Sequence, residues 1–375
     1  MNNQRIIAVD ILRGLTIIFM IIVNDPGSWS HVYSPLLHAD WNGLTPTDYI
    51  FPTFLFIMGT SIVLSLGRKA QSLPKKELIK KIILRSIKIY IVGLILWLWP
   101  EFDFERIRWV GVLPRIAFVY FFTALLFVYT SRKTQLFTAI GLVVGYLILM
   151  CFVPVPGIGI PDLSVPGKNW AHYIDRLYLP GVLWEETWDP EGILSTLPAI
   201  ATGIFGMLAG YIIKSQKQLP RKLIELFTMG SVLLFFGDVF QYIFPINKNL
   251  WSSSFTLFLA GISSLALGFF VFICDLKQWG KHLTFAQIFG VNSIFTYALA
   301  GIFTTIFYSD RIWGFKFNDI FMEGVTSLGV APKLASLFYA LLYAGIIWLP
   351  AKYLYYKKIY TVSYTHLTLP TKRIV

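Results

Sequence analysis

Long apolar stretches alternate with short polar connectors along the whole chain. A helix needs about 20 mostly apolar residues to cross the hydrocarbon core of a bilayer. Stretches of this length are bounded by Pro, Gly and charged clusters, which mark their ends. They predict crossings at 6–25, 48–67, 82–100, 110–130, 135–153, 193–213, 224–243, 254–273, 285–307 and 333–350. The pattern therefore predicts an all-α integral membrane protein, a polytopic bundle of about ten transmembrane helices.

Composition supports this class of protein. Of the 375 residues, 56% are hydrophobic and only 14% are charged, which is far more apolar than a soluble domain needs to fill its core. We expect residues 1–361 to form a single transmembrane domain. The segment 362–375 contains "VSYTHLTLPT", which resembles the translation of a sequencing-library adapter, and we expect it to be non-native.

The net charge of +12 is distributed unevenly between the two sides of the predicted bundle. Counted over alternate connectors, Lys and Arg number 18 on one side and 7 on the other. Because positively charged connectors stay in the cytoplasm, both termini are predicted to be cytoplasmic. The excess charge is thus explained by topology, and no nucleic-acid partner is expected.

An unusually polar junction, "LLHADWNGLTPTDYIFP" at 36–52, separates the first two predicted helices on the outer side. The side chains of Asn24, His38 and Asp48 can come together where the two predicted helices meet the outer membrane interface. Histidine suits proton transfer, an asparagine amide can stabilise an oxyanion, and a carboxylate can orient an imidazole. Asp48 is preferred over Asp40 for this last role because it begins a rigid helix. The plainer alternative is a solvated loop histidine.

Other ionisable side chains lie within the predicted crossings, where they are costly and often functional. Asp10 and Arg13 are three residues apart and form either a self-neutralised pair or a ligand site. Arg85 and Lys88, also three apart, either snorkel to lipid phosphates or form a cationic mouth for an anionic ligand. Arg115 lies near the outer end of its helix.

Several further features bear on chemistry or structure. Trp41 could stack on a sugar ring or anchor the chain at the membrane interface. The motif "GMLAG" at 206–210 is a small-xxx-small pattern typical of close helix packing. Cys151 and Cys274 are predicted near opposite faces and cannot pair. No cluster has metal-ligand spacing, so no metal is expected.

Four stretches, taken in order, resemble the transmembrane acetyltransferases typified by heparan-α-glucosaminide N-acetyltransferase, in their short bacterial form. They are "VDILRGLTIIFMIIVN", "HADWNGLTPTDYIFPTFLFIMGTSI", "WDPEGILSTLPAIATGIFGMLAG" and "PINKNLWSSSFTLFLAGIS". The resemblance covers residues 5 to about 360. It implies a multi-pass enzyme of the bacterial inner membrane that moves acetyl from cytoplasmic acetyl-CoA to an amino-sugar amine outside. It also implies that His38 is the acetyl-transfer residue and that Asn24 is catalytic.

The remaining site residues are expected to act on one side or the other of the bundle. Trp41, Asn42, Asp40 and Arg115 are assigned to the acceptor. The phosphates of acetyl-CoA need cations at the inner mouth, and the assigned residues are Asp10, Arg13, Arg85 and Lys88. His38 could be a general base for direct transfer, or its imidazole could be acetylated first.

Two alternatives to this function remain open. One is a secondary transporter in which Asp10, Arg13 and Asp238 relay ions or protons. The other is an O-acyltransferase acting on an envelope polysaccharide. The expected partners are acetyl-CoA, an amino-sugar acceptor, the lipid bilayer and a second copy of the chain in a homodimer.

Overall fold

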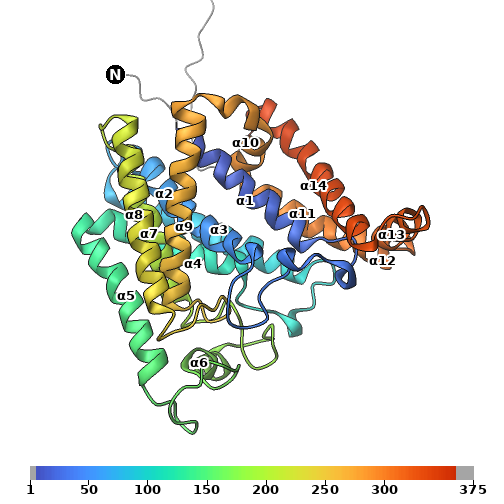
Figure 1. Cartoon of the computed structure of the whole chain (residues 1–375), viewed down its shortest axis with the longest axis horizontal. Coiled ribbons are helices and arrows are strands. Elements are labelled where there is room, and N and C mark those ends of the chain that lie inside the picture. The colour runs from blue at the N-terminus through green and yellow to red at the C-terminus, as the bar shows by residue number, and fades with distance from the viewer. Residues whose placement is uncertain (1–5, 360–375) are drawn as a thin grey trace, which may run out of the picture.

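The computed structural model describes residues 6–359, and its regular elements there are all helices (Figure 1). Within this range the only β-type pairings are two isolated bridges, Arg108 with Gly181 and Val155 with Gly159. The all-α class is therefore confirmed. The N-terminal residue counted in the charge analysis, Arg5, and the expected non-native tail lie outside the described residues.

Every predicted crossing corresponds to helix. The long helices are α1 (Ala8–Asn24), α2 (Ile50–Lys69), α3 (Lys75–Leu98), α4 (Val112–Tyr129), α5 (Arg132–Phe152), α7 (Thr196–Lys214), α8 (Leu219–Phe240), α9 (Ser253–Phe270) and α14 (Pro332–Tyr356). Within residues 6–359, seven helical segments are long and apolar enough to cross a membrane, or eight if one bent pair is a single span. The predicted count of ten is not confirmed, because α1 has only 17 residues and α3 carries several basic residues.

One predicted crossing, 285–307, is broken in the structure. It consists of α10 (Thr284–Val291) and α11 (Ser293–Tyr308), and the segments Trp279–Val291 and Ser293–Tyr308 are bent by 72°. Asn292 lies at the break, where its side-chain amide donates a hydrogen bond to the carbonyl oxygen of Ile359 at 3.0 Å. The crossing predicted at 285–307 is therefore helical but bent, and Asn292 at the break is bonded to Ile359, three residues beyond the end of α14.

The helices at the centre of the bundle approach each other through glycines. A Cβ atom at Gly206 would overlap the carbonyl oxygen of Phe56, and one at Gly59 would overlap that of Gly203. These contacts bring the backbones of α2 and α7 together, so "GMLAG" is confirmed as a packing motif. In the same way, Gly14 of α1 lies against the backbone of α10.

The connectors predicted to be outer, for which we keep that name, contain helices that the apolar pattern did not indicate. These are α6 (Trp170–Tyr178), α12 (Asp310–Trp313) and α13 (Phe317–Ser327), with α6 apart from the long helices in Figure 1. They are short and amphipathic or polar, so they carry no 20-residue apolar signal. Together with the irregular segments, they form the side of the bundle on which His38 lies.

Both ends of the described chain lie at one end of the bundle. The backbone N–H groups of Ile7 and Ala8 donate to the carboxylate of Asp275, just after α9, at 2.9 and 3.1 Å. Ile359 is joined to Asn292 at the break between α10 and α11. This arrangement agrees with an even number of crossings, and the cytoplasmic side remains a prediction.

Candidate active site

Asp48 fixes His38 at the outer start of α2. A 3₁₀ turn, Pro46–Tyr49, leads into the helix and is closed by a capping box between Thr45 and Asp48. The Oδ1 atom of Asp48 lies 2.6 Å from His38 Nδ1, and Oδ2 accepts from the N–H groups of Thr45 at 2.9 Å and Ala39 at 3.2 Å. The Asp48 side chain is 0% exposed, whereas that of His38 is 47% exposed. A carboxylate bound at Nδ1 favours the tautomer that leaves Nε2 as the basic nitrogen.

A lysine that the sequence analysis did not single out lies directly against His38. Lys248 Nζ is 2.9 Å from His38 Nε2 and 3.0 Å from Nδ1, and it is 4.0 Å from Asp48 Oδ1. If Nζ lay in the plane of the ring at these distances from both nitrogens, it would overlap a ring carbon, such as Cε1 between the two nitrogens. Nζ therefore lies over the face of the imidazole. Lys248 belongs to the quoted stretch "PINKNLWSSSFTLFLAGIS", which was the one available signal.

The segment that carries Lys248 is tied to the segment that carries His38. Asn247 is buried, and its side-chain amide donates to Asn42 Oδ1 at 3.1 Å. One residue away, the N–H of Gly43 donates to the carbonyl oxygen of Ile246 at 2.8 Å. Asn42, assigned to the acceptor from the sequence, is thus placed as a link between the two segments beside the site.

Trp41 belongs to an aromatic cluster that holds the longest outer connector. Its Nε1 donates to the carbonyl oxygen of Leu163 at 2.9 Å, and its ring meets those of His172 and Trp188 edge-on. His172 stacks on Trp188 at 4.3 Å and accepts the N–H of Gly167 at Nδ1. Burial lowers the pKa of His172 to about 3, so this histidine stays neutral and is structural.

Neither Asn24 nor Asp40 forms a hydrogen bond with His38 or Asp48 in the described chain. Asn24 is an exposed residue at the end of α1, and Asp40 is exposed in the loop. The neighbouring Asp25 is buried and accepts a hydrogen bond from Thr304 Oγ1 at 2.7 Å. Of the two aspartates considered as partners of His38, Asp48 is the one in contact with it.

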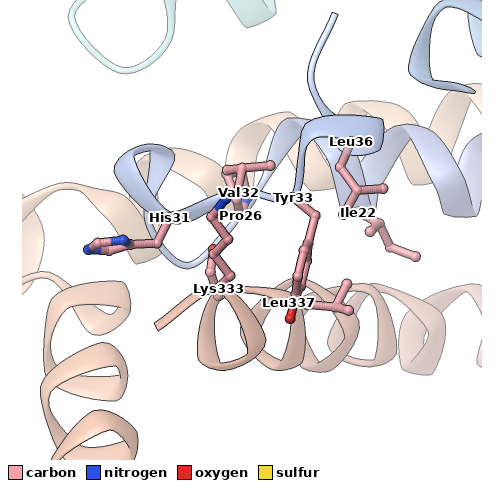
Figure 2. Close-up of a pocket in the computed structure, with 10 residues that line it drawn as sticks. Ile22, Pro26, His31, Val32, Tyr33, Leu36, Lys333 and Leu337 are labelled. Carbon is pink, nitrogen blue, oxygen red and sulfur yellow. The ribbon is translucent and has the colours of Figure 1, made fainter. Parts of the chain in front are cut away.

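A crevice lies between residues 26–36 and α14 (Figure 2). Its walls are mainly apolar, with Lys333 and the exposed His31 also lining it, and Tyr33 and Leu337 lie close together in the view. Leu36 lines the crevice two residues before His38. His31 forms no ion pair with a carboxylate among residues 6–359, which distinguishes it from His38.

A buried ion-pair cluster lies on the same side of the bundle. Arg108 donates two hydrogen bonds to Asp189, at 2.7 and 2.6 Å, and one to Glu191 at 2.6 Å. Its guanidinium also lies over the ring of Trp184, 5.0 Å from the centroid. Burial opposes the charge of Arg108, but the two carboxylates together raise its pKa. This cluster fixes the connector 180–192 to the region before α4.

Arg115 is buried in the bundle beneath this connector. Its Nη2 donates to the carbonyl oxygen of Gly192 at 3.2 Å and, by a short contact, to Ser195 Oγ at the start of α7. The guanidinium lies over Trp251, 5.1 Å from the ring centroid, and only 1% of the residue is exposed. Arg115 is thus buried, unlike the exposed Asp40 and Asn42 with which the sequence grouped it, and its charge still acts on Lys248.

On the inner side, Asp10 and Arg13 form a pair inside the bundle. Arg13 Nη1 lies 3.3 Å from Asp10 Oδ1 and donates to the carbonyl oxygen of Gly290 at 3.1 Å. Arg13 Nη2 donates to Ser61 Oγ at 2.5 Å. The pair therefore joins α1 to α2 and α10, which favours the structural alternative for these two residues.

Basic side chains gather at the inner ends of α2, α3, α5 and α7. Lys69 experiences the charges of Lys81, Arg85 and Arg68, and Lys214 experiences those of Arg68 and Arg132. We call this set the inner basic cluster: Arg68, Lys69, Lys81, Arg85, Arg132 and Lys214. Arg85 also lies 4.8 Å over the ring of Tyr120, whereas Lys88 is exposed. Among residues 6–359 no group of three or more His, Cys, Asp or Glu side chains is arranged to hold a metal ion.

The sequence is also similar to known proteins. The family described as heparan-alpha-glucosaminide N-acetyltransferase, catalytic, matches residues 5–244. The heparan-alpha-glucosaminide N-acetyltransferase of Mus musculus is 31% identical over 355 residues, covering 79% of this chain and 53% of that protein. The protein of the same name from Homo sapiens is 30% identical, covering 90% of this chain and 59% of that protein. The chain thus spans a little over half the length of these relatives.

Proposed function

The chain belongs to the heparan-α-glucosaminide N-acetyltransferase catalytic family, and on this premise we propose that it is a transmembrane N-acetyltransferase. It would take acetyl from cytoplasmic acetyl-CoA and transfer it to the amine of a glucosamine-like sugar on the outer side. The observation that carries the proposal is the contact between His38 and the fully buried Asp48. This contact engages Nδ1, so Nε2 of the half-exposed imidazole, which lies 2.9 Å from Lys248 Nζ, is the nitrogen that would act on a substrate.

The geometry suits either of two mechanisms. In direct transfer, Nε2 of His38 removes a proton from the acceptor's ammonium, and the resulting amine attacks the thioester carbon as CoA leaves. In the stepwise route, Nε2 attacks the thioester first, and the acetylated imidazole then passes the acetyl group to the amine. In both routes Asp48 holds Nδ1–H and stabilises the positive charge that develops on the ring.

The inner basic cluster supports a binding site for acetyl-CoA on the cytoplasmic side. Guanidinium and ammonium groups bind phosphate oxygens well, and the donor carries several phosphate charges. The cluster lies at the inner end of α2, and Asp48 lies just before its outer end. We propose that the donor's phosphates bind the cluster while its thioester extends along α2 toward His38. Of the residues assigned to the donor from the sequence, Arg85 belongs to this cluster.

The outer side suits a cationic acceptor. Exposed acidic side chains near the site include Asp40, and Glu185 and Glu186 lie in the connector that covers the bundle. An ammonium group is attracted by such a surface before it loses its proton.

We further propose that the protein lies in the bacterial inner membrane, that residues 1–361 form one domain, and that the chain assembles as a homodimer.

The test is CoA release by the purified chain in detergent, given acetyl-CoA and a panel of amino sugars. We expect His38→Ala to lower turnover by about 100-fold or more, the usual range for a general acid–base residue. His31→Ala is the matched control, since it removes an exposed outer histidine without a carboxylate partner, and it should keep wild-type turnover.

Two results would contradict the proposal. Full activity in His38→Ala would remove the catalytic role of this histidine. Turnover with sugar hydroxyls but with no amine would favour the O-acyltransferase alternative. The geometry favours a structural role over the transporter alternative for Asp10 and Arg13, because Arg13 donates hydrogen bonds to α2 and α10 and pairs with Asp10.

A further inference from the structure

Neither mechanism for acetyl transfer uses the amine of Lys248, although its Nζ lies only 2.9 Å from His38 Nε2. Nζ lies over the imidazole face, 2.9 and 3.0 Å from the two ring nitrogens. An acetyl carbon bonded to Nε2 at about 1.4 Å would lie in the ring plane, roughly 3.5 Å from Nζ. That separation is close to the 3–3.5 Å between reacting atoms in a near-attack arrangement. Nζ would approach the acetyl carbon from above the plane of the acyl group.

The surroundings of Lys248 leave its charge poorly compensated. Its nearest carboxylate is that of Asp48 at 4.0 Å, and Asp48 already accepts hydrogen bonds from His38, Ala39 and Thr45. The Lys248 side chain is only 19% exposed. Burial lowers its pKa, with Glu191 and Asp48 opposing this effect and Arg115 adding to it. The neutral, nucleophilic amine is therefore easier to form here than on an exposed lysine.

We propose that Lys248 is itself an acetylation site of this enzyme, modified when the acetyl group reaches His38 and no acceptor is bound. The Nζ lone pair attacks the carbonyl carbon and forms an amide bond. In the stepwise route the bond from that carbon to Nε2 breaks, and the proton lost by Nζ returns to the imidazole. In the direct route the bond to the CoA sulfur breaks, and His38 takes the proton. Each event consumes one acetyl group and yields Nε-acetyllysine.

This inference rests on the proposed acetyltransferase function and extends it. An amide does not pass its acetyl group on, so the modification stops at one per chain at this position. A bound amino sugar would intercept the acetyl group first, because its amine occupies the outer side of His38. The fraction of chains acetylated at Lys248 is therefore expected to increase with the time that the enzyme spends with acetyl-CoA bound and no acceptor.

The experiment uses the full chain in detergent with isotopically labelled acetyl-CoA and no amino sugar, followed by peptide mass spectrometry. We expect Lys248 to be acetylated at least about tenfold faster than Lys168, because a held nucleophile has a high effective concentration. Lys168 is the internal control, as an exposed lysine of the outer connector. The label should fall in His38→Ala and in the presence of the amino sugar, and it should be absent at position 248 in Lys248→Arg.

The outcomes separate this inference from the function on which it rests. Equal labelling of Lys248 and Lys168, or unchanged labelling of Lys248 in His38→Ala, would show simple chemical acetylation and overturn the inference. CoA release with an amino sugar but an unlabelled Lys248 in its absence would overturn the inference alone. Labelling of Lys248 that depends on His38, without turnover of any amine, would support the inference and contradict the proposed acceptor.

Discussion

Asp48 is the residue on which the orientation of His38 depends. Replacing it by Asn keeps the size of the side chain but removes the negative charge beside Nδ1. We expect Asp48→Asn to lower the turnover number for CoA release on the order of 100-fold, as loss of acid–base function does, with little change in the KM for acetyl-CoA. The measurement is steady-state kinetics of the purified variant in detergent.

The control for this prediction is Asp40→Asn. Asp40 is exposed and forms no hydrogen bond within residues 6–359, so its variant should keep near wild-type turnover. The opposite result, a slow Asp40→Asn beside an active Asp48→Asn, would show that the observed contact is not the functional one. Because Asp48 also closes the capping box, its variant should be checked for a small loss of thermal stability, worth about 1 kcal/mol.

The sequence predicts part of this site and misses another part for a simple reason. His38 and Asp48 are ten residues apart, so a loop followed by a helix start is enough to suggest that they meet. Lys248 is 210 residues from His38, and no local pattern reports a contact of that separation. The burial of His172 was equally hidden, since it depends on Trp188 and Trp41 from other parts of the outer connectors.

Among the helices, α2 and α7 are in close backbone contact at Gly59 and Gly206, and this gives a second prediction. A Cβ at Gly206 would overlap the carbonyl oxygen of Phe56, which is a backbone atom and cannot rotate away. We expect Gly206→Ala to destabilise the fold by at least ~2 kcal/mol, within the range for overpacked cores. The measurement is the melting temperature in detergent, taken from the loss of monodisperse protein on heating, and we expect it to be lower in Gly206→Ala than in the wild type.

Gly145→Ala provides the matched comparison. Gly145 lies in α5, and a Cβ there meets no atom within 4 Å, so this helix should tolerate the change or gain slightly from it. Equal stability of the two variants would mean that α2 and α7 can separate without cost, contrary to the packing described for "GMLAG".

The apolar pattern predicts a helix well when the whole helix is apolar. It predicts the ends less well when they are charged or depend on contacts with other parts of the chain. The predicted start of α3 at residue 82 is late by about two turns, because its basic first half, beginning at Lys75, has no apolar signal. The break between α10 and α11 was missed because residues 285–307 are apolar on both sides of Asn292. At the break, Asn292 donates a hydrogen bond to Ile359, and no local pattern reports a contact with so distant a part of the chain.

For the molecule as a whole, the proposed function requires that the inner basic cluster and His38 face opposite compartments. The structure places them at opposite ends of α2, with the cluster at its C-terminal end and His38 beside Asp48 just before its N-terminal end. Charge counting predicts which compartment each one faces, since 18 Lys and Arg lie in one set of connectors and 7 in the other. This orientation can be measured without any assumption about catalysis.

The last prediction is that Lys168 is external and Lys133 is cytoplasmic. Both side chains are exposed, and they lie in connectors that the topology assigns to opposite sides. In a background carrying Cys151→Ser and Cys274→Ser, we expect Lys168→Cys to react with a membrane-impermeant maleimide in cells whose inner membrane is intact. Lys133→Cys should react only after that membrane is permeabilised. Because Trp41 donates a hydrogen bond to Leu163 in the same connector as Lys168, the result also locates His38. The reverse labelling would place His38 in the cytoplasm, where acetyl-CoA and acceptor would meet on one side and no transfer across the membrane would be needed.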